Sequence, residues 1–133
     1  MKRMFVIAAL ALAACNPTVD SSQGAFETID EAVLQDVACV FRPADGTEGV
    51  FFATYADNPD FLAVARYKNE TIKLVPREVP VFDGDTFDIT YEVIDYLKWQ
   101  VRAEAVDGEG GLTLIQDGTA TDITADMIGS CGA

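Results

Sequence analysis

The side chains that carry most enzymatic chemistry are scarce in this chain of 133 residues. It contains no histidine, so no imidazole is present to act as a base, a proton shuttle or a metal ligand. Serine occurs as Ser21, Ser22 and Ser130, and none has an evident partner that would activate it as a nucleophile. Two carboxylates can catalyse glycoside hydrolysis, but no pair among the 22 acidic residues is marked out by its sequence context. We therefore expect a protein that binds rather than catalyses, and that uses no cofactor.

Three carboxylates, Asp83, Asp85 and Asp88, lie close together in the sequence. Calcium prefers such oxygen ligands, but their spacing does not match the EF-hand loop. The other interpretation of these residues is a solvated hairpin turn before a strand. We expect these residues to form the turn without a metal ion. Calcium binding by the three carboxylates is the alternative.

Three cysteines divide into one that follows an apolar run and two that do not. Met4–Ala14 is an uninterrupted apolar run after the basic pair Lys2-Arg3, and it is far shorter than the roughly 20 residues of a membrane-spanning helix. This is the pattern of an export signal. It ends at Leu12-Ala13-Ala14-Cys15.

That ending resembles the lipobox of bacterial lipoproteins, in which the cysteine is acylated and the peptide before it is removed. The resemblance implies that Cys15 carries the lipid, such as palmitate, and that two or more acyl chains hold the protein on a membrane. The alternative is a secretory signal cut after Ala13 or Ala14. Asn16, in place of an aspartate that retains lipoproteins in the inner membrane, favours the outer membrane facing the periplasm.

We therefore divide the chain into a signal peptide (1–14), an acylated tether (15–24) of turn-forming composition and one domain (25–133). Loss of Lys2 and Arg3 with the signal leaves seven basic residues against 22 acidic ones, which is a net charge of −15. This charge disfavours nucleic acid, whose phosphates need clustered Lys and Arg. It favours a basic partner.

Cys39 and Cys131 remain after Cys15 is assigned to lipid. An even pair in an exported domain predicts a disulfide, with two buried free thiols as the alternative. A zinc site is not expected, because two cysteines without histidine do not complete a tetrahedral shell.

The domain is predicted to be a small antiparallel β-barrel or sandwich of seven or eight strands with a short N-terminal helix. The helix is indicated by the capping box of Thr28 and Glu31. The apolar residues that would share one face of it are Phe26, Ile29, Val33 and Val37.

The strongest strand signal runs from Thr86 to Val106, where apolar and polar residues alternate. Asp95 interrupts the alternation, so a turn or bulge is expected at Ile94–Tyr96 before the pattern resumes at Leu97. Other reversals are expected at Lys68–Glu70 and at Asp117-Gly118, a two-residue hairpin signal. The aromatic residues expected in the core are Phe51, Phe52, Tyr55, Phe87, Tyr91 and Trp99.

The last predicted element is one helical turn at Thr124–Ile128, with Gly129 as its stop.

A small acylated β-domain closed by an early and a late cysteine resembles the membrane-bound inhibitors of C-type lysozyme. The resemblance covers roughly Val37–Cys131 and is carried by Ala63–Leu74, similar to the family's paired central strands, and by Trp99 followed by Glu104-Ala105. It implies inhibition of lysozyme, a basic protein. The family's Ser/Gly-rich loop and inhibitory lysine have no matching positions, so no inhibitory residue is transferred.

The expected function is therefore a lipid-anchored envelope protein with a non-catalytic domain that binds a basic partner such as lysozyme. Two alternatives remain open. One is a structural accessory of an outer-membrane or cell-wall assembly. The other is a carrier that holds a small ligand in a barrel cavity, because periodicity does not distinguish a filled barrel from a hollow one.

Overall fold

The computed structural model describes residues 24–56 and 61–132, which form one antiparallel sheet. The signal peptide, Cys15 and most of the tether lie outside these residues. Within them, no helix is long and apolar enough to cross a membrane. The strands are β2 (Phe26–Glu27), β3 (Val37–Pro43), β4 (Phe52–Tyr55), β5 (Ala63–Tyr67), β6 (Glu70–Pro76), β7 (Phe87–Val93), β8 (Trp99–Val106), β9 (Glu109–Gln116) and β10 (Thr119–Cys131).

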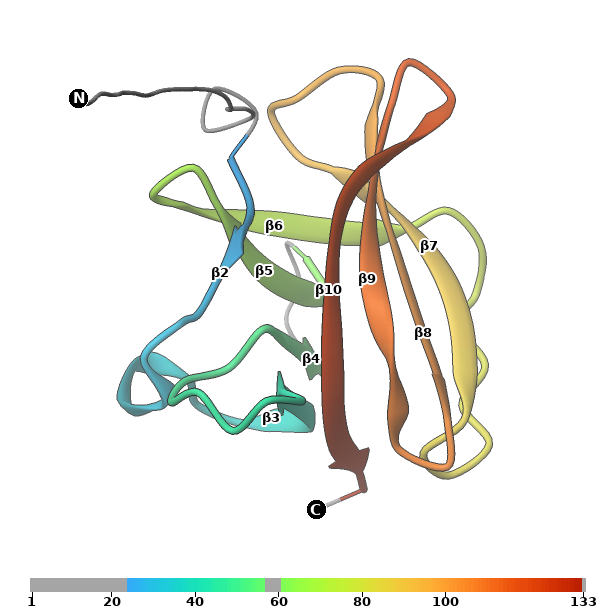
Figure 1. Cartoon of the computed structure of the whole chain (residues 1–133). Helices are drawn as coiled ribbons and strands as arrows, with labels where there is room; N and C mark the ends of the chain where they lie inside the picture. The colour runs from blue at the N-terminus through green and yellow to red at the C-terminus, as the bar shows by residue number, and fades with distance from the viewer. Residues whose placement is uncertain (1–23, 57–60, 133) are drawn as a thin grey trace, which may run out of the picture.

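The sheet closes into a barrel, which confirms the predicted antiparallel β architecture and distinguishes the barrel from the sandwich; eight strands form the barrel and one extra strand pairs beside it (Figure 1). The strand order is β2-β5-β4-β3-β10-β9-β8-β7-β6, and pairing of β5 with β6 joins the two ends of the eight strands β3 to β10. The extra strand β2 pairs with Arg66 and Tyr67 of β5, whereas β4 pairs with Ala63 and Val64 of the same strand. Closure leaves no long unpaired edge on β3 to β10.

Short turns connect many of these strands, because their residues tolerate positive φ. Asp117 and Gly118 have φ of 54° and 81° and join β9 to β10, as expected for a type I′ hairpin. Lys68 and Asn69 make the predicted reversal between β5 and β6 in the same way. The turn near Asp95 is also confirmed, but β8 begins at Trp99, so Leu97 is not part of the alternation and is 88% exposed.

The predicted N-terminal helix is wrong. The structure has a three-residue 3₁₀ turn at Glu31–Val33, capped by the Asp30 side chain rather than by Thr28. The predicted apolar face is divided between elements, because Phe26 belongs to β2 and Ile29 bridges to Val50 of the barrel. The sheet hydrogen bonds and burial of this segment therefore stabilise it more than helix formation would, because so short a helix does not persist alone.

The helical turn predicted at Thr124–Ile128 is also wrong, because this stretch is the middle of β10. Burial has a period of two there, with Ile123, Ala125 and Met127 inward. Gly129 is a strand residue rather than a helix stop. A Cβ at this position would collide with the Val40 carbonyl of the neighbouring strand, so the glycine permits close approach of the two backbones.

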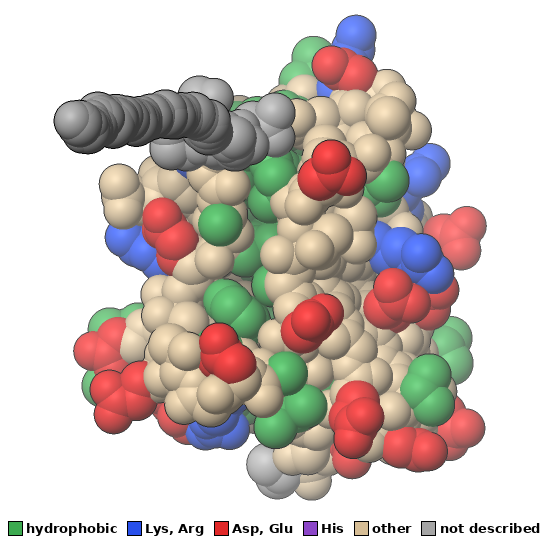
Figure 2. All heavy atoms as spheres, viewed as in Figure 1, with side chains coloured by type: hydrophobic (Ala, Val, Ile, Leu, Met, Phe, Trp, Pro, Cys, Tyr) green, Lys and Arg blue, Asp and Glu red, His purple; other side chains and the backbone are tan. Residues whose placement is uncertain are grey.

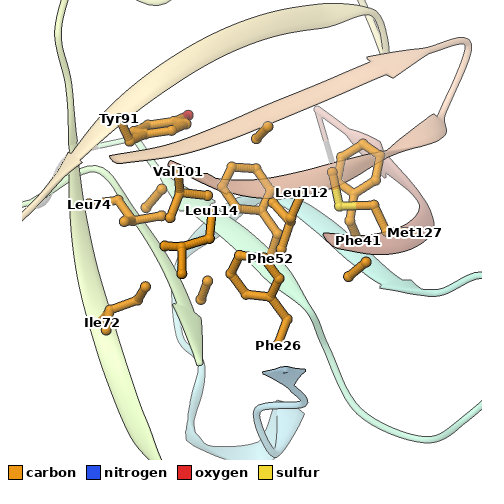
Figure 3. Packing of buried hydrophobic residues seen from close by; sticks show 14 of the residues in the cluster. Phe26, Phe41, Phe52, Ile72, Leu74, Tyr91, Val101, Leu112, Leu114 and Met127 are labelled. Carbon is orange, nitrogen blue, oxygen red and sulfur yellow. The ribbon is translucent and has the colours of Figure 1, made fainter. Parts of the chain in front are cut away.

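Apolar side chains fill the centre of the barrel (Figure 3). Large inward residues of β7 are paired with small residues on the adjacent strand β8: Phe87 lies beside Ala105, and Ile89 lies beside Ala103. This alternation of size lets the inward layers interdigitate. Among the aromatic residues expected in the core, three are buried and three are partly buried; the buried ones are Phe52, Phe87 and Tyr91, and the others are Phe51, Tyr55 and Trp99. The filled centre counts against a ligand carried there.

Candidate functional site

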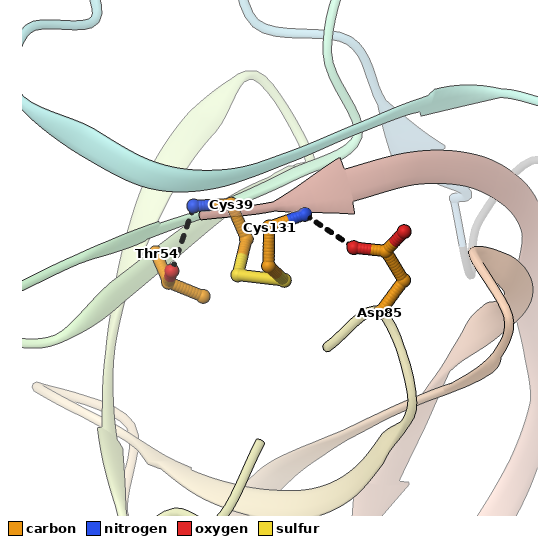
Figure 4. The surroundings of a disulfide bond; sticks show 4 residues. All are labelled: Cys39, Thr54, Asp85 and Cys131. Atoms are coloured by element: carbon orange, nitrogen blue, oxygen red, sulfur yellow. Dashed lines mark hydrogen bonds between the residues drawn. A yellow bond between two sulfur atoms is a disulfide. The ribbon is translucent and has the colours of Figure 1, made fainter. Parts of the chain in front are cut away.

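The Cys39–Cys131 disulfide is confirmed and joins two neighbouring strands (Figure 4). The two cysteines lie directly opposite each other on β3 and β10, although 92 positions separate them in the sequence. Their backbone N–H groups donate hydrogen bonds to side chains of other segments. The Cys39 N–H donates to Thr54 Oγ1 at 3.1 Å, and the Cys131 N–H donates to Asp85 Oδ1 at 2.8 Å. The disulfide therefore fixes the C-terminus to the first barrel strand.

The three carboxylates considered for calcium have separate partners. Asp83 and Thr86 form a two-way backbone bridge, which is the expected hairpin turn. Asp85 accepts from Cys131, and Asp88 forms an ion pair with Arg102 at 2.6 Å. Hydrogen bonding from the Arg102 guanidinium lowers the pKa of the Asp88 carboxyl. Within residues 24–56 and 61–132, no three acidic or cysteine side chains form a group that could hold a metal ion.

An apolar cleft opens beside the disulfide, at the end of the barrel where the chain finishes. Its volume is about 330 Å³, at the lower end of the range for small-molecule sites. Strands and loops far apart in sequence contribute to it. The residues that line it are Ala38, Cys39, Thr54, Tyr55, Ala56, Leu62, Pro80, Phe82, Tyr91, Cys131 and Gly132.

Tyr91 is one of the lining residues with a polar side-chain group. The residue is 1% exposed, and its hydroxyl makes no hydrogen bond within the described part of the chain. Burial alone raises its pKa well above the ordinary value of a phenol. A buried hydroxyl is normally paired, so an unpaired one calls for an explanation.

Carboxylates gather at the same end of the barrel. We call this group the acidic end, and it consists of Asp45, Asp83, Asp85, Asp107, Glu109 and Asp126. Backbone hydrogen bonds link its parts, from Ala44 to Asp126 and from Gly108 to Asp85, each at 3.0 Å. Figure 2 shows acidic side chains over the lower half of the molecule, where Figure 1 has the C-terminus.

Arg42 borders the acidic end, and its guanidinium forms an ion pair with Glu31 at 2.6 Å. Because the carboxylate of Glu31 already balances the charge of Arg42, Arg42 offsets little of the negative charge of the acidic end. The acidic end therefore presents a largely uncompensated negative surface within the described chain.

The chain enters the barrel at the opposite end, which we call the entry end. Gly24 lies against Tyr67 and Lys68 at the β5–β6 turn. The β9–β10 hairpin lies at the entry end as well. There the backbone N–H of Asp117 donates a hydrogen bond to the Lys98 carbonyl at 2.9 Å. Lysines and carboxylates are mixed there, in contrast to the acidic end.

Comparison of the chain with protein-family models finds no match. Comparisons with curated proteins and with solved structures find none either.

Sequence reasoning missed both the cleft and the acidic end. The sequence pattern predicts that Tyr91 lies in the core. That pattern does not depend on whether the buried hydroxyl has a hydrogen-bond partner, so it gives no sign of the cleft. Leu62, Pro80 and Phe82 come from loops, where periodicity carries no information on position. The excess of acidic residues was visible in the composition, but its placement at one end depends on strand pairing.

Proposed function

We propose that the protein is a lipid-anchored component of the bacterial envelope whose barrel is a non-catalytic binding domain for a basic protein. Cys15 carries the lipid in this proposal, and the tether to residue 24 joins it to the barrel. The outer membrane, with the domain in the periplasm, is the proposed location.

The observation that carries the proposal is the position of the acidic end relative to the chain entry. An anchor at Cys15 approaches the barrel through Gly24, which lies at the entry end. Nine tether residues extend to roughly 30 Å at most, so the entry end is the side held nearer the membrane. The acidic end then points away from the bilayer and is accessible to a partner.

Charge supports a basic partner over other classes. A surface of one sign attracts proteins of the opposite sign and raises their rate of association. The mature net charge of −15 acts in the same direction as the local cluster. A C-type lysozyme is the sharpest candidate, because such enzymes are basic and the domain resembles their membrane-bound inhibitors.

Binding is tested by passing a basic C-type lysozyme over the immobilised mature domain at low salt. We expect retention that weakens as salt rises, since screening acts on exposed charges, together with reduced lysis of cell walls. Lack of retention with undiminished lysis would overturn the lysozyme proposal.

The anchor is tested separately with Cys15→Ala. We expect the variant to lose its acyl groups and to move from the membrane fraction to the soluble fraction. Unchanged membrane association would refute the lipobox assignment, whatever the outcome with lysozyme.

A further inference from the structure

We propose that the cleft beside the disulfide binds a small, uncharged, mostly apolar molecule that carries one hydrogen-bond-accepting oxygen. This site goes beyond the proposed interaction with a basic protein. It uses different residues and does not require that interaction.

The walls of the cleft set the apolar part of the ligand. Tyr55, Leu62 and Phe82 supply ring and aliphatic surfaces, and the disulfide supplies sulfur. Such walls favour an apolar body through the area they remove from water. A volume of about 330 Å³ admits a single ring with a short substituent.

The buried hydroxyls set the polar part. Tyr91 is among the residues that line the cleft, and its hydroxyl has no hydrogen-bond partner in the described chain. Thr54 Oγ1 already accepts from the Cys39 N–H, and no acceptor for its own hydrogen is found among the described residues. Both groups can therefore donate, so the complementary ligand atom is an acceptor.

Charge at this end of the barrel disfavours an anion. The Asp85 carboxylate accepts a hydrogen bond from the backbone N–H of Cys131, which lines the cleft, and no Lys or Arg side chain is among the lining residues. A carboxylate in the cleft would be repelled and would lose water without a cation to compensate it. An oxygen acceptor without charge satisfies the hydroxyls without that penalty.

The test is an NMR titration of the mature, disulfide-bonded domain with three matched probes. Acetophenone has a ring and a carbonyl acceptor, toluene has the ring alone, and benzoate carries a negative charge. We expect acetophenone to shift the amides of Cys39, Thr54 and Cys131 and to bind about three- to ten-fold more tightly than toluene, as one neutral hydrogen bond allows. Benzoate should produce no saturable shifts at these amides.

Tyr91→Phe tests the role of the hydroxyl, since phenylalanine keeps the ring. We expect the preference for acetophenone over toluene to fall about three-fold, because one of the two donors is lost and the Thr54 hydroxyl remains. Ala56→Phe, at the exposed edge of the cleft, should block both probes. Ala120→Phe, an equally exposed change on β10 near the entry end, should leave binding unchanged.

Two results would overturn the site. One is the absence of saturable shifts at the cleft amides with acetophenone. The other is an unchanged preference in Tyr91→Phe. Neither result bears on lysozyme retention, so failure of this site and failure of the proposed function are distinguishable.

Discussion

Removing the hydroxyl of Tyr91 should stabilise the protein, which is the opposite of the usual effect of a core substitution. Tyr91 is 1% exposed, and its ring packs against Phe52 with centroids 5.7 Å apart. Phenylalanine keeps that packing and removes a hydroxyl that folding takes out of water and that has no hydrogen-bond partner among the described residues. Such a group costs about 1–3 kcal/mol. We therefore expect Tyr91→Phe to raise the free energy of unfolding by about 1–2 kcal/mol.

The assay is equilibrium unfolding of the mature domain in urea, with the disulfide intact. Tyr96→Phe is the matched control, because the Tyr96 hydroxyl is exposed and donates to the Glu70 carboxylate. Its loss should lower the free energy of unfolding by about 0–1 kcal/mol. Destabilisation by Tyr91→Phe of more than about 0.5 kcal/mol would show that the hydroxyl has a partner in the native state and would refute the reasoning.

The same group makes a prediction about alkaline pH. Burial holds the pKa of Tyr91 far above its ordinary value of 10 in the folded protein, whereas the unfolded chain ionises near 10. The unfolded state therefore binds fewer protons above pH 10, and stability falls as pH rises. The slope should be shallower in Tyr91→Phe by up to about 1.4 kcal/mol per pH unit. Equal slopes in the two proteins, measured by urea unfolding between pH 9 and 10.8, would contradict this.

Three further predictions concern the barrel frame. Replacing Cys39 and Cys131 by serine should lower the free energy of unfolding by about 4–5 kcal/mol in the chain-entropy account of a loop of this length; a loss below about 1 kcal/mol in urea unfolding would contradict it. Gly110→Ala should prevent formation of the native barrel, because its Cβ would collide with a β8 carbonyl; a native-like NMR spectrum would refute that steric argument. Arg102→Ala should cost only about 0–1 kcal/mol at neutral pH, because the ion pair is exposed. That contribution should disappear as pH falls through the lowered pKa of Asp88, and a difference from wild type that persists at pH 2 would contradict the assignment.

Local patterns in the sequence predict most of the strands. The alternation of β7 has a period of two and places Phe87, Ile89 and Tyr91 inward, as the structure confirms. The Asp117-Gly118 hairpin is equally local, because the turn type depends on the φ values of two residues. The disulfide follows from cysteine number and the expected export.

Errors arise where long-range pairing outweighs local preference. Thr28 and Glu31 form a helix-capping pattern, but the bridge from Ile29 to Val50 draws the segment onto the barrel. Local sequence patterns could not predict the cleft for the same reason. Its wall combines residues as distant as Ala38 and Gly132, and only strand pairing brings them together.

The most direct test of the central claim is the affinity of the mature domain for a basic C-type lysozyme after neutralisation of the acidic end. The triple variant Asp107→Asn, Glu109→Gln and Asp126→Asn removes three charges there while keeping side-chain size. We expect a dissociation constant, measured by calorimetry at low salt, at least about ten-fold weaker than that of wild type.

The matched control removes three charges toward the entry end, with Asp95→Asn, Asp117→Asn and Asp122→Asn. All three carboxylates are exposed, and net charge changes by the same amount. The proposal predicts a change of less than about three-fold in the control, because its charges lie far from the partner. Equal weakening by the two triple variants, or no binding of lysozyme by the wild-type domain, would contradict the claim that the acidic end receives a basic partner.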